Sequence, residues 1–364
     1  MFERQFGHPA EIAESAPGRV NIIGEHTDYN GGFMLPIALP HRTDVLLSRR
    51  DDGLIWVRSL DLAASSPLGH YALGEERRQG EWLDYVKGVT YMARPLGSSV
   101  FGCNLLISST VPIGKGLSSS AALQVGLLRA LNRAWHLDLD DLSIAKLAHR
   151  AETEFVGAPV GMMDQMAASL GTQSTALLID GRSLAFEPVP LPDAVELVVL
   201  DSGISHNHAS GEYRVRRREC EEAATSLGVA QLRDLTESDL PTLDALPPTL
   251  ASRARHVITE NARVLGTVKA FREGDISTAG RLVSASHTSL RDDFDVSTRE
   301  IDRLVEIADS EHEVLGARIT GGGFGGAVVA LCRRPHAATI ARRVIESYRA
   351  LTKRDGAVLL PRSA

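Results

Sequence analysis

Three consecutive serines that follow two glycines form the stretch of this chain best suited to bind an anion. The stretch covers residues 112–122, which are Pro112, Ile113, Gly114, Lys115, Gly116, Leu117, Ser118, Ser119, Ser120, Ala121 and Ala122. The glycines allow close approach of the backbone and positive φ angles. The serines stand where a helix should begin, and the free N–H groups and positive dipole end of a helix favour an anion. The residue types therefore indicate a phosphate-binding loop.

A simpler interpretation of this stretch is a glycine turn followed by a serine that caps a helix. That interpretation explains one serine and one glycine, but it gives the other serines and the alanine pair no role. The loop is not a Walker loop, because no Gly-Lys-Ser/Thr ends it.

Two other residues could serve the transfer of a phosphoryl group. Such transfer needs an anion cradle, a divalent metal, a positioned acceptor hydroxyl and charge that stabilises the transferred group. Asp164 lies at the start of a short predicted helix, where it could act on an acceptor hydroxyl or merely cap the helix. Arg19 follows a Pro-Gly turn, where it could hold a carboxylate in its charged form or lie at the surface.

A polar loop near the N-terminus, residues 24–30, contains Glu25, His26 and Asp28. Each hydroxyl of a sugar is both a donor and an acceptor, and carboxylates with an imidazole suit such a ligand. The competing interpretation is a metal site, although one histidine with two acids is a weak signal for a metal.

The elements that must position these residues can be read from hydrophobic periodicity. Apolar runs predict strands at 16–21, 34–39, 43–48, 54–59, 105–111, 176–180, 195–200, 317–320 and 327–332. Helical spacing predicts helices at 82–92, 118–135, 140–155, 161–170, 212–227, 250–271, 275–290, 297–310 and 336–351. Pro40 is expected to separate two strands, the proline-rich residues 187–192 to cross between domains, and residues 240–250 to form a loop. This mixed order indicates an α+β fold.

Composition limits the classes of function. A length of 364 residues favours two domains, with a boundary near residue 180, and 43% hydrophobic residues are ordinary for a globular chain. A net charge of −7 argues against nucleic acid as the main partner. The basic residues Arg214, Arg216, Arg217 and Arg218 are followed by acids, which predicts a solvated helix face.

The cysteines and the apolar segments bear on the compartment. Three widely spaced cysteines without a C-x-x-C pair favour a reducing cytosol. The N-terminus lacks the apolar core of a signal peptide, and no run is long enough to cross a bilayer. We therefore expect a cytoplasmic protein that has no membrane partner.

Three segments of the chain resemble the motifs of the galactokinase branch of the GHMP small-molecule kinases. Residues 17–30 resemble its N-terminal signature, residues 112–121 its nucleotide-binding motif, and residues 321–326 its C-terminal glycine motif. The segment around Asp164 and the Glu-Tyr-x-x-Arg-Arg-x-x-Cys-like run around Tyr213 also resemble family segments.

The resemblance implies a two-domain GHMP kinase fold, with domains at 1–180 and 181–364 and the active site in the cleft between them. It implies transfer of the γ-phosphoryl group of Mg-ATP to the C1 hydroxyl of α-D-galactose, giving α-D-galactose 1-phosphate and ADP, by a monomer or weak oligomer. The alternatives are a kinase for N-acetylgalactosamine or arabinose, and a non-catalytic sensor of galactose and ATP. Such sensors lose a Ser-Ala pair from the phosphate loop, and Ser120-Ala121 is intact here.

The resemblance also implies roles for individual residues. Asp164 takes the position of the catalytic base and Arg19 that of the catalytic arginine. The residues implied to bind galactose are Glu25, His26, Asp28, Gly161 and Tyr213. The residues implied to bind ATP are Pro112, Gly114, Lys115, Gly116, Leu117, Ser118, Ser119, Ser120 and Ala121. The residues implied to bind Mg²⁺ are Ser120 and Glu152. Glu154 lies two positions further along and could be confused with Glu152. Lys115 and Gln124 depart from the usual pattern, since a small residue and an acid are frequent at these positions.

Overall fold

A computed structural model describes residues 1–62, 68–204 and 209–361 of the chain. The chain divides into two compact units. The first comprises Met1–Arg19, Ala38–Ile113 and Leu117–Gly171, and the second comprises Val20–Ile37, Gly114–Gly116 and Thr172–Ala364. The division into domains at 1–180 and 181–364 stays a prediction. The α+β fold is confirmed, since helices and sheets occur in both units.

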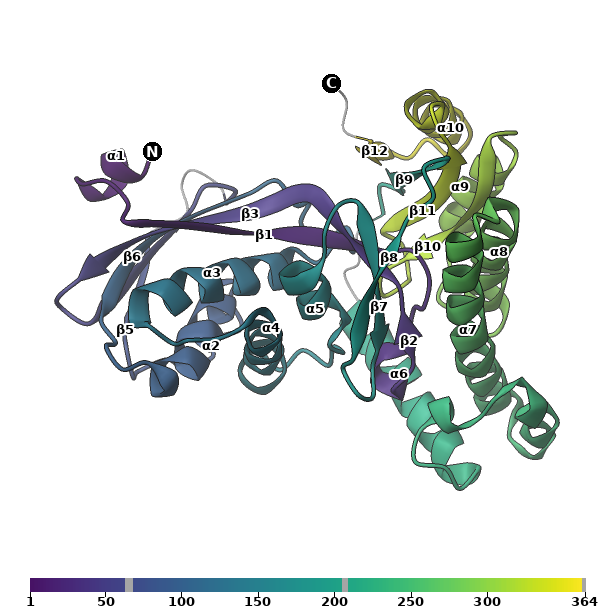
Figure 1. Cartoon of the computed structure of the whole chain (residues 1–364), viewed down its shortest axis with the longest axis horizontal. Helices are drawn as coiled ribbons and strands as arrows, with labels where there is room; N and C mark the ends of the chain where they lie inside the picture. The colour runs from purple at the N-terminus through teal and green to yellow at the C-terminus, as the bar shows by residue number, and fades with distance from the viewer. Residues whose placement is uncertain (63–67, 205–208, 362–364) are drawn as a thin grey trace. The chain divides into compact units, whose positions relative to one another are not determined.

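The first unit is a five-stranded sheet with helices on one face (Figure 1). In spatial order its strands are β1 (Ile12–Asn21), β3 (Pro36–Arg50), β6 (Gly102–Ser109), β4 (Leu54–Ser59) and β5 (Gly69–Ala72). The helices on the sheet are α2 (Leu83–Ala93), α3 (Ser119–Trp135), α4 (Asp141–Arg150) and α5 (Met163–Leu170), and the short α1 (Phe2–Phe6) precedes β1. Val57 and Leu105 of the sheet share one buried apolar core with Val89 and Leu127 of the helices.

The prediction that Pro40 separates two strands is wrong, because β3 runs without interruption from Pro36 to Arg50. Its antiparallel pairing with β6 begins only at Thr43, opposite Ser109. Pro40 lies before that pairing, so the N–H group that proline lacks costs β3 no hydrogen bond to β6.

The second unit contains two sheets. A four-stranded sheet has the order β10 (Val314–Thr320), β11 (Ala327–Arg333), β9 (Val195–Asp201) and β12 (Ala357–Leu360). A three-stranded sheet has the order β2 (Phe33–Met34), β7 (Thr175–Asp180) and β8 (Phe186–Pro190). The unit's helices are α6 (Ala209–Ser226), α7 (Pro248–Glu273), α8 (Ile276–Asp292), α9 (Arg299–Asp309) and α10 (Ala337–Thr352). The two long helices α7 and α8 run side by side, with α8 against β10 (Figure 1).

Three local predictions about the second unit are wrong. The proline-rich segment 187–192 does not cross between the units, because it lies wholly within the second one. Part of it forms β8, an edge strand where prolines are tolerated because only one side of the strand must donate hydrogen bonds. The expected loop at 240–250 contains a 3₁₀ helix, Glu237–Ala245. Arg216 does not face solvent, since its guanidinium group is buried and donates to the carbonyl oxygens of Phe294 and Asp295.

All three cysteines, Cys103, Cys220 and Cys332, are buried and unpaired. Burial raises the pKa of each thiol to about 12, so all three remain protonated at neutral pH. Within the described ranges, no helix has both the length and the apolar character needed to cross a membrane.

Candidate functional site

Arg19 and Asp164 form an ion pair within the first unit. Arg19 lies on β1 and Asp164 in the first turn of α5, and the two are 145 residues apart in sequence. The arginine Nε and Nη2 atoms lie 2.9 Å and 2.5 Å from the same carboxylate oxygen, Oδ1. Asp164 does not cap α5, because Met162 occupies the N-cap position. The carboxylate is therefore held by charge, with 21% of its side chain exposed.

The first serine of the phosphate loop also contacts Asp164. Ser118 is the N-cap residue of α3, but its hydroxyl makes no capping bond and instead donates to Asp164 Oδ2 at 2.5 Å. Its φ angle of 59° lies in the left-handed region. The simpler interpretation as a serine cap is therefore wrong for Ser118, and both oxygens of Asp164 are fixed by donors from different elements.

Glu152 is a buried carboxylate near the Arg19–Asp164 ion pair, and only 4% of the residue is exposed. Its Oε2 accepts from Gln165 Nε2 at 2.7 Å, and the Ser120 hydroxyl also bonds to it. Burial, followed by the charge of Asp164, raises the pKa of Glu152 to about 7, against the opposing effects of Ser120, Gln165 and Arg19. A carboxylate and a hydroxyl are the hard oxygen donors that a magnesium ion takes, so these residues fit such an ion.

A π-helical turn, Ala151–Val156, continues α4 and carries both acids that the sequence left as metal candidates. Glu152 points into the unit, whereas Glu154 is exposed and pairs with Arg150, whose Nε lies 2.8 Å from Glu154 Oε1. Such π turns are rare and frequently lie at functional sites. No sequence signal marks this one, because the helix predicted at 140–155 covers nearly all of it.

The phosphate loop needs its two glycines. Gly114 and Gly116 have φ angles of 72° and 74°, which side chains rarely adopt. A Cβ atom on Gly321 would lie 3.3 Å from the Cα atom of Gly116, so the C-terminal glycine motif approaches the loop closely. Lys115 neither points to solvent nor stays unpaired, because its Nζ lies 2.8 Å from the buried Asp201 at the end of β9.

The polar loop is built into the second unit. Glu25 is 3% exposed, and its Oε1 accepts from the Gly321 N–H at 2.7 Å and the Thr320 hydroxyl at 3.0 Å, with Arg318 Nη2 also 3.0 Å away. Two hydrogen bonds and one ion pair thus converge on one oxygen of Glu25.

His26 lies in an aromatic group within the same unit. Its ring centroid is 5.9 Å from that of Tyr29, 5.3 Å from Tyr213 and 4.7 Å from Phe294, and its Nδ1 lies 3.0 Å from the Tyr29 hydroxyl. Burial, aided by nearby cations, lowers the pKa of His26 well below its usual value. The imidazole is therefore neutral at pH 7 and offers one donor and one acceptor. The structure thus brings His26 and Tyr213 together.

Three further candidates have simpler settings. Asp28 begins a 3₁₀ turn, Asp28–Asn30, and is half-buried. Gly161 is half-buried in the segment before α5, in the same unit as Asp164. Gln124 is fully buried in α3, and within the described ranges its amide makes no hydrogen bond. Nothing in the structure explains the glutamine at this position.

Residues that sequence analysis missed support the polar loop. His256 and Glu260 of α7 and Arg318 of β10 are each fully buried and contact the backbone or side chains of residues 21–25. They follow the loop by more than 230 residues, so no local pattern could have revealed them. Among the residues described, no group of three or more His, Cys, Asp or Glu side chains could hold a metal ion. This finding gives the metal interpretation of the polar loop no support.

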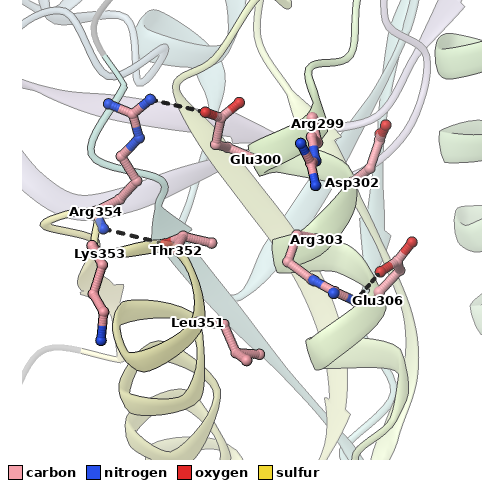
Figure 2. Close-up of a pocket in the computed structure, with 9 residues that line it drawn as sticks. All are labelled: Arg299, Glu300, Asp302, Arg303, Glu306, Leu351, Thr352, Lys353 and Arg354. Carbon is pink, nitrogen blue, oxygen red and sulfur yellow. Dashed lines mark hydrogen bonds and ion pairs between the residues drawn. The ribbon is translucent and has the colours of Figure 1, made fainter.

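A pocket of about 690 Å³ lies between α9 and the end of α10 (Figure 2). It is lined by Arg299, Glu300, Asp302, Arg303, Glu306, Leu351, Thr352, Lys353 and Arg354. Within the pocket, Arg354 pairs with Glu300 at 2.9 Å and Arg303 pairs with Glu306 at 2.8 Å. Two of the arginines that line the pocket are therefore neutralised by two of its glutamates. None of the candidate site residues lines it.

Family models match three parts of the chain. Residues 1–49 match the "Galactokinase galactose-binding signature", residues 84–172 the "GHMP kinases N terminal domain", and residues 267–350 the "GHMP kinases C terminal" model. These segments include the polar loop and the phosphate loop.

Curated relatives and solved structures agree with these matches. A galactokinase of Haemophilus influenzae is 41% identical, with 97% of this chain and 93% of the relative covered. A galactokinase of Mycobacterium bovis is 46% identical, with 92% of each covered. The crystal structure of Lactococcus lactis galactokinase complexed with galactose superposes with a TM-score of 0.92 at 31% identity, covering 98% of this chain and 95% of that one. A Methanococcus jannaschii mevalonate kinase, 18% identical with a TM-score of 0.70, shares the fold, and the match covers 95% of this chain and 96% of that chain.

The curated relatives are named galactokinases, which favours the main prediction over a kinase for another sugar and over a sensor. The GHMP kinase fold and the assignment as a sugar kinase are confirmed. The chain belongs to the galactokinases, a branch of the GHMP kinase family.

Proposed function

We propose that this chain transfers the γ-phosphoryl group of ATP to the C1 hydroxyl of α-D-galactose. In this reaction the C1 oxygen forms a bond to Pγ, and the bond between Pγ and the bridging oxygen breaks to release ADP. The hydroxyl proton passes to Asp164. The products are α-D-galactose 1-phosphate and ADP.

The Arg19–Asp164 pair is the observation that carries this proposal. A general base must be fixed within hydrogen-bond reach of its proton, and Asp164 is fixed by Arg19 on one oxygen and by Ser118 on the other. Oδ1 accepts two bonds from Arg19, whereas Oδ2 accepts one from Ser118, and a carboxylate oxygen has two acceptor positions, so Oδ2 can also accept from a substrate hydroxyl. Arg19 places positive charge beside the base, where charge develops during phosphoryl transfer.

The phosphate loop and the buried acid serve the nucleotide. The free N–H groups at the start of α3 suit the phosphates of ATP. Glu152 and Ser120 would hold a divalent cation, which we assign as Mg²⁺, and such an ion neutralises phosphate charge when bound. Asp164 raises the pKa of Glu152, as burial does, and a nearby cation would offset both effects.

The polar loop serves the sugar. We assign Glu25, neutral His26, Asp28 and Tyr213 to galactose hydroxyls, with Gly161 beside the base. Buried polar groups discriminate between epimers because the wrong epimer leaves some of them without partners.

A coupled assay of ADP release over a sugar panel tests the proposal. Galactose should support turnover far better than glucose, arabinose or N-acetylgalactosamine. Loss of the reducing end in the product would place the phosphate at C1. Faster turnover with N-acetylgalactosamine, or no ADP release with any sugar, would count against the proposal.

Glu152→Gln should raise the magnesium concentration needed for half-maximal activity and leave the galactose KM nearly unchanged. The amide keeps the shape of the side chain but removes the charge that holds a cation. Excess magnesium should restore part of the activity by mass action. Because the pKa of Glu152 is about 7, the wild-type requirement should rise as the pH falls from 8 to 6, since protonation removes the ligand. The variant should lack this pH dependence.

Glu154→Gln is the matched control for that experiment. It removes the same charge two positions along the chain, from a side chain that is exposed and paired with Arg150. Its magnesium requirement should match that of the wild type. A shifted requirement in Glu154→Gln but not in Glu152→Gln would assign the metal to the other acid.

His26→Ala and Asp28→Ala should act mainly through the galactose KM, raised about 10-fold or more by the loss of hydrogen bonds to the sugar. The ATP KM should change little. Because His26 is neutral through this range, its effect should not vary between pH 6 and 8. Isothermal titration with galactose and with ATP separates the two affinities, and equal losses for both ligands would contradict the assignment.

A further inference from the structure

Helix α7 places two fully buried polar residues, His256 and Glu260, against the backbone of the polar loop. They lie four positions apart and therefore on one side of the helix. Burial of a polar or charged group costs free energy unless hydrogen bonds compensate for it. The proposed reaction uses neither residue, so their burial requires another explanation.

Glu260 binds the polar loop through a backbone N–H group. Its Oε1 accepts from the Gly24 N–H at 2.9 Å and the Ser286 hydroxyl at 2.7 Å, and its Oε2 accepts from Arg263 Nε at 2.7 Å. Burial alone would raise the pKa of Glu260, but nearby charges, Arg263 foremost, outweigh it and lower the pKa to about 2. The Gly24 N–H therefore donates to a charged acceptor, which makes a stronger bond than a neutral one.

His256 holds the next residue of the loop. Its Nε2 lies 3.1 Å from the carbonyl oxygen of Glu25, and its Nδ1 lies 3.0 Å from the Ser289 hydroxyl. A carbonyl oxygen can only accept, so Nε2 carries the proton and donates. Burial lowers the pKa of His256 to about 4, which keeps the ring neutral and preserves this tautomer at neutral pH.

These two bonds act on a backbone that would otherwise relax. Gly24 and His26 have φ angles of 98° and 61°, both in the left-handed region. A non-glycine residue such as His26 holds that conformation only when its surroundings fix it. The Gly24 N–H and the Glu25 carbonyl lie just before His26 in the chain, so bonds to them determine where the imidazole points.

We propose that Glu260 and His256 are positioning residues that set galactose affinity by fixing the backbone of Gly24 and Glu25. The inference rests on the proposed function, because it takes the polar loop as the part that receives the sugar. Neither residue touches substrate. Disturbing either one should weaken galactose binding through the loop and leave ATP binding unchanged.

Two substitutions of His256 test the donor directly. His256→Leu removes the N–H group, and the galactose KM should rise about 10-fold, the effect expected from the loss of one buried hydrogen bond. His256→Gln retains an N–H donor and should keep the KM within about 3-fold of the wild type. The ATP KM should stay within about 2-fold in both. Equal effects of the two substitutions on the galactose KM would overturn the role of the donor.

Glu260→Gln tests the charged acceptor with a matched control on the same helix. It should raise the galactose KM about 10-fold, because the Gly24 N–H then meets a neutral acceptor. Thr267→Val is the control: Thr267 is also fully buried in α7, but among the described residues its hydroxyl bonds only to the Arg263 carbonyl, so the galactose KM of this variant should match the wild type. If Glu260→Gln does not fold, Ser286→Ala can replace it, because this variant loses one hydrogen bond to the same carboxylate. Its galactose KM should also rise, but by less than about 10-fold.

Hydrogen exchange of the loop amides, measured without substrate, separates this inference from the proposed function. Residues 24–30 should exchange faster in Glu260→Gln (or in Ser286→Ala in its place) and in His256→Leu than in Thr267→Val. Unchanged exchange in those variants would overturn the positioning role whatever the activity. A wild-type protein that releases no ADP with galactose would overturn the proposed function, and the exchange rates would still decide the role of α7.

Discussion

Asp164→Ala should abolish phosphoryl transfer while the fold and ATP binding survive. Removing a positioned general base costs about 10²- to 10⁴-fold in rate, and the proposed reaction has Asp164 as the acceptor of the C1 proton. The residue lies in the first turn of α5 without capping it, so its loss should disturb the helix little. A coupled ADP assay, with ATP binding measured by titration, checks the two expectations together.

Asp164→Asn sharpens this experiment because it keeps the shape and the ability to accept from Arg19. It should be as inactive as the alanine variant if proton acceptance matters, and partly active if Asp164 only orients Arg19 and Ser118. Asp141→Asn, which alters an exposed acid of the same unit, serves as the control and should keep full activity. Near-normal turnover by a folded Asp164→Ala protein would remove Asp164 from the mechanism.

Arg19→Ala should lower kcat by about 10²-fold or more, with a much smaller rise in the galactose KM. Its guanidinium group is buried against Asp164, where positive charge counts for more than it does in water. Steady-state kinetics with both substrates varied separates kcat from KM. The loss should persist at saturating galactose.

Arg19→Lys is the informative companion. It keeps the charge but replaces two contacts to Asp164 Oδ1 with at most one, because a lysine presents a single nitrogen. Its kcat should fall between those of the wild type and the alanine variant. A rise in KM without a change in kcat would reduce Arg19 to a binding residue.

The fold was largely predictable, because strong periodicity marks most of the helices and strands. Each failure has a specific physical cause. Pro40 suggests a break in the sequence, yet it stands in β3 before the pairing with β6 begins, where its missing N–H costs no hydrogen bond to β6. The acids that follow Arg216 suggest a solvated side chain. In the structure, however, Arg216 donates to the carbonyl oxygens of Phe294 and Asp295, which lie 78 and 79 positions further along the chain. A charge pattern along one helix carries no information about such distant partners.

The candidate site was predictable only in part. Motif resemblance named Arg19 and Asp164, but it could not show that Ser118 donates to the second oxygen of Asp164, since that bond depends on a left-handed N-cap. The distinction between Glu152 and Glu154 depends on a π-helical turn, which hydrophobic spacing does not reveal. His256 and Glu260 looked like ordinary residues of an amphipathic helix.

The burial of all three cysteines makes the protein easy to label at a chosen place. Thiols with a pKa near 12 and no exposed surface react slowly with maleimides, so the native cysteines need not be replaced first. Ile113 in the phosphate loop is 63% exposed. Ile113→Cys would supply one reactive thiol, and a fluorophore attached to it would report nucleotide binding as a change in emission. Affinity for ATP could then be measured without turnover, even in variants that no longer catalyse the reaction.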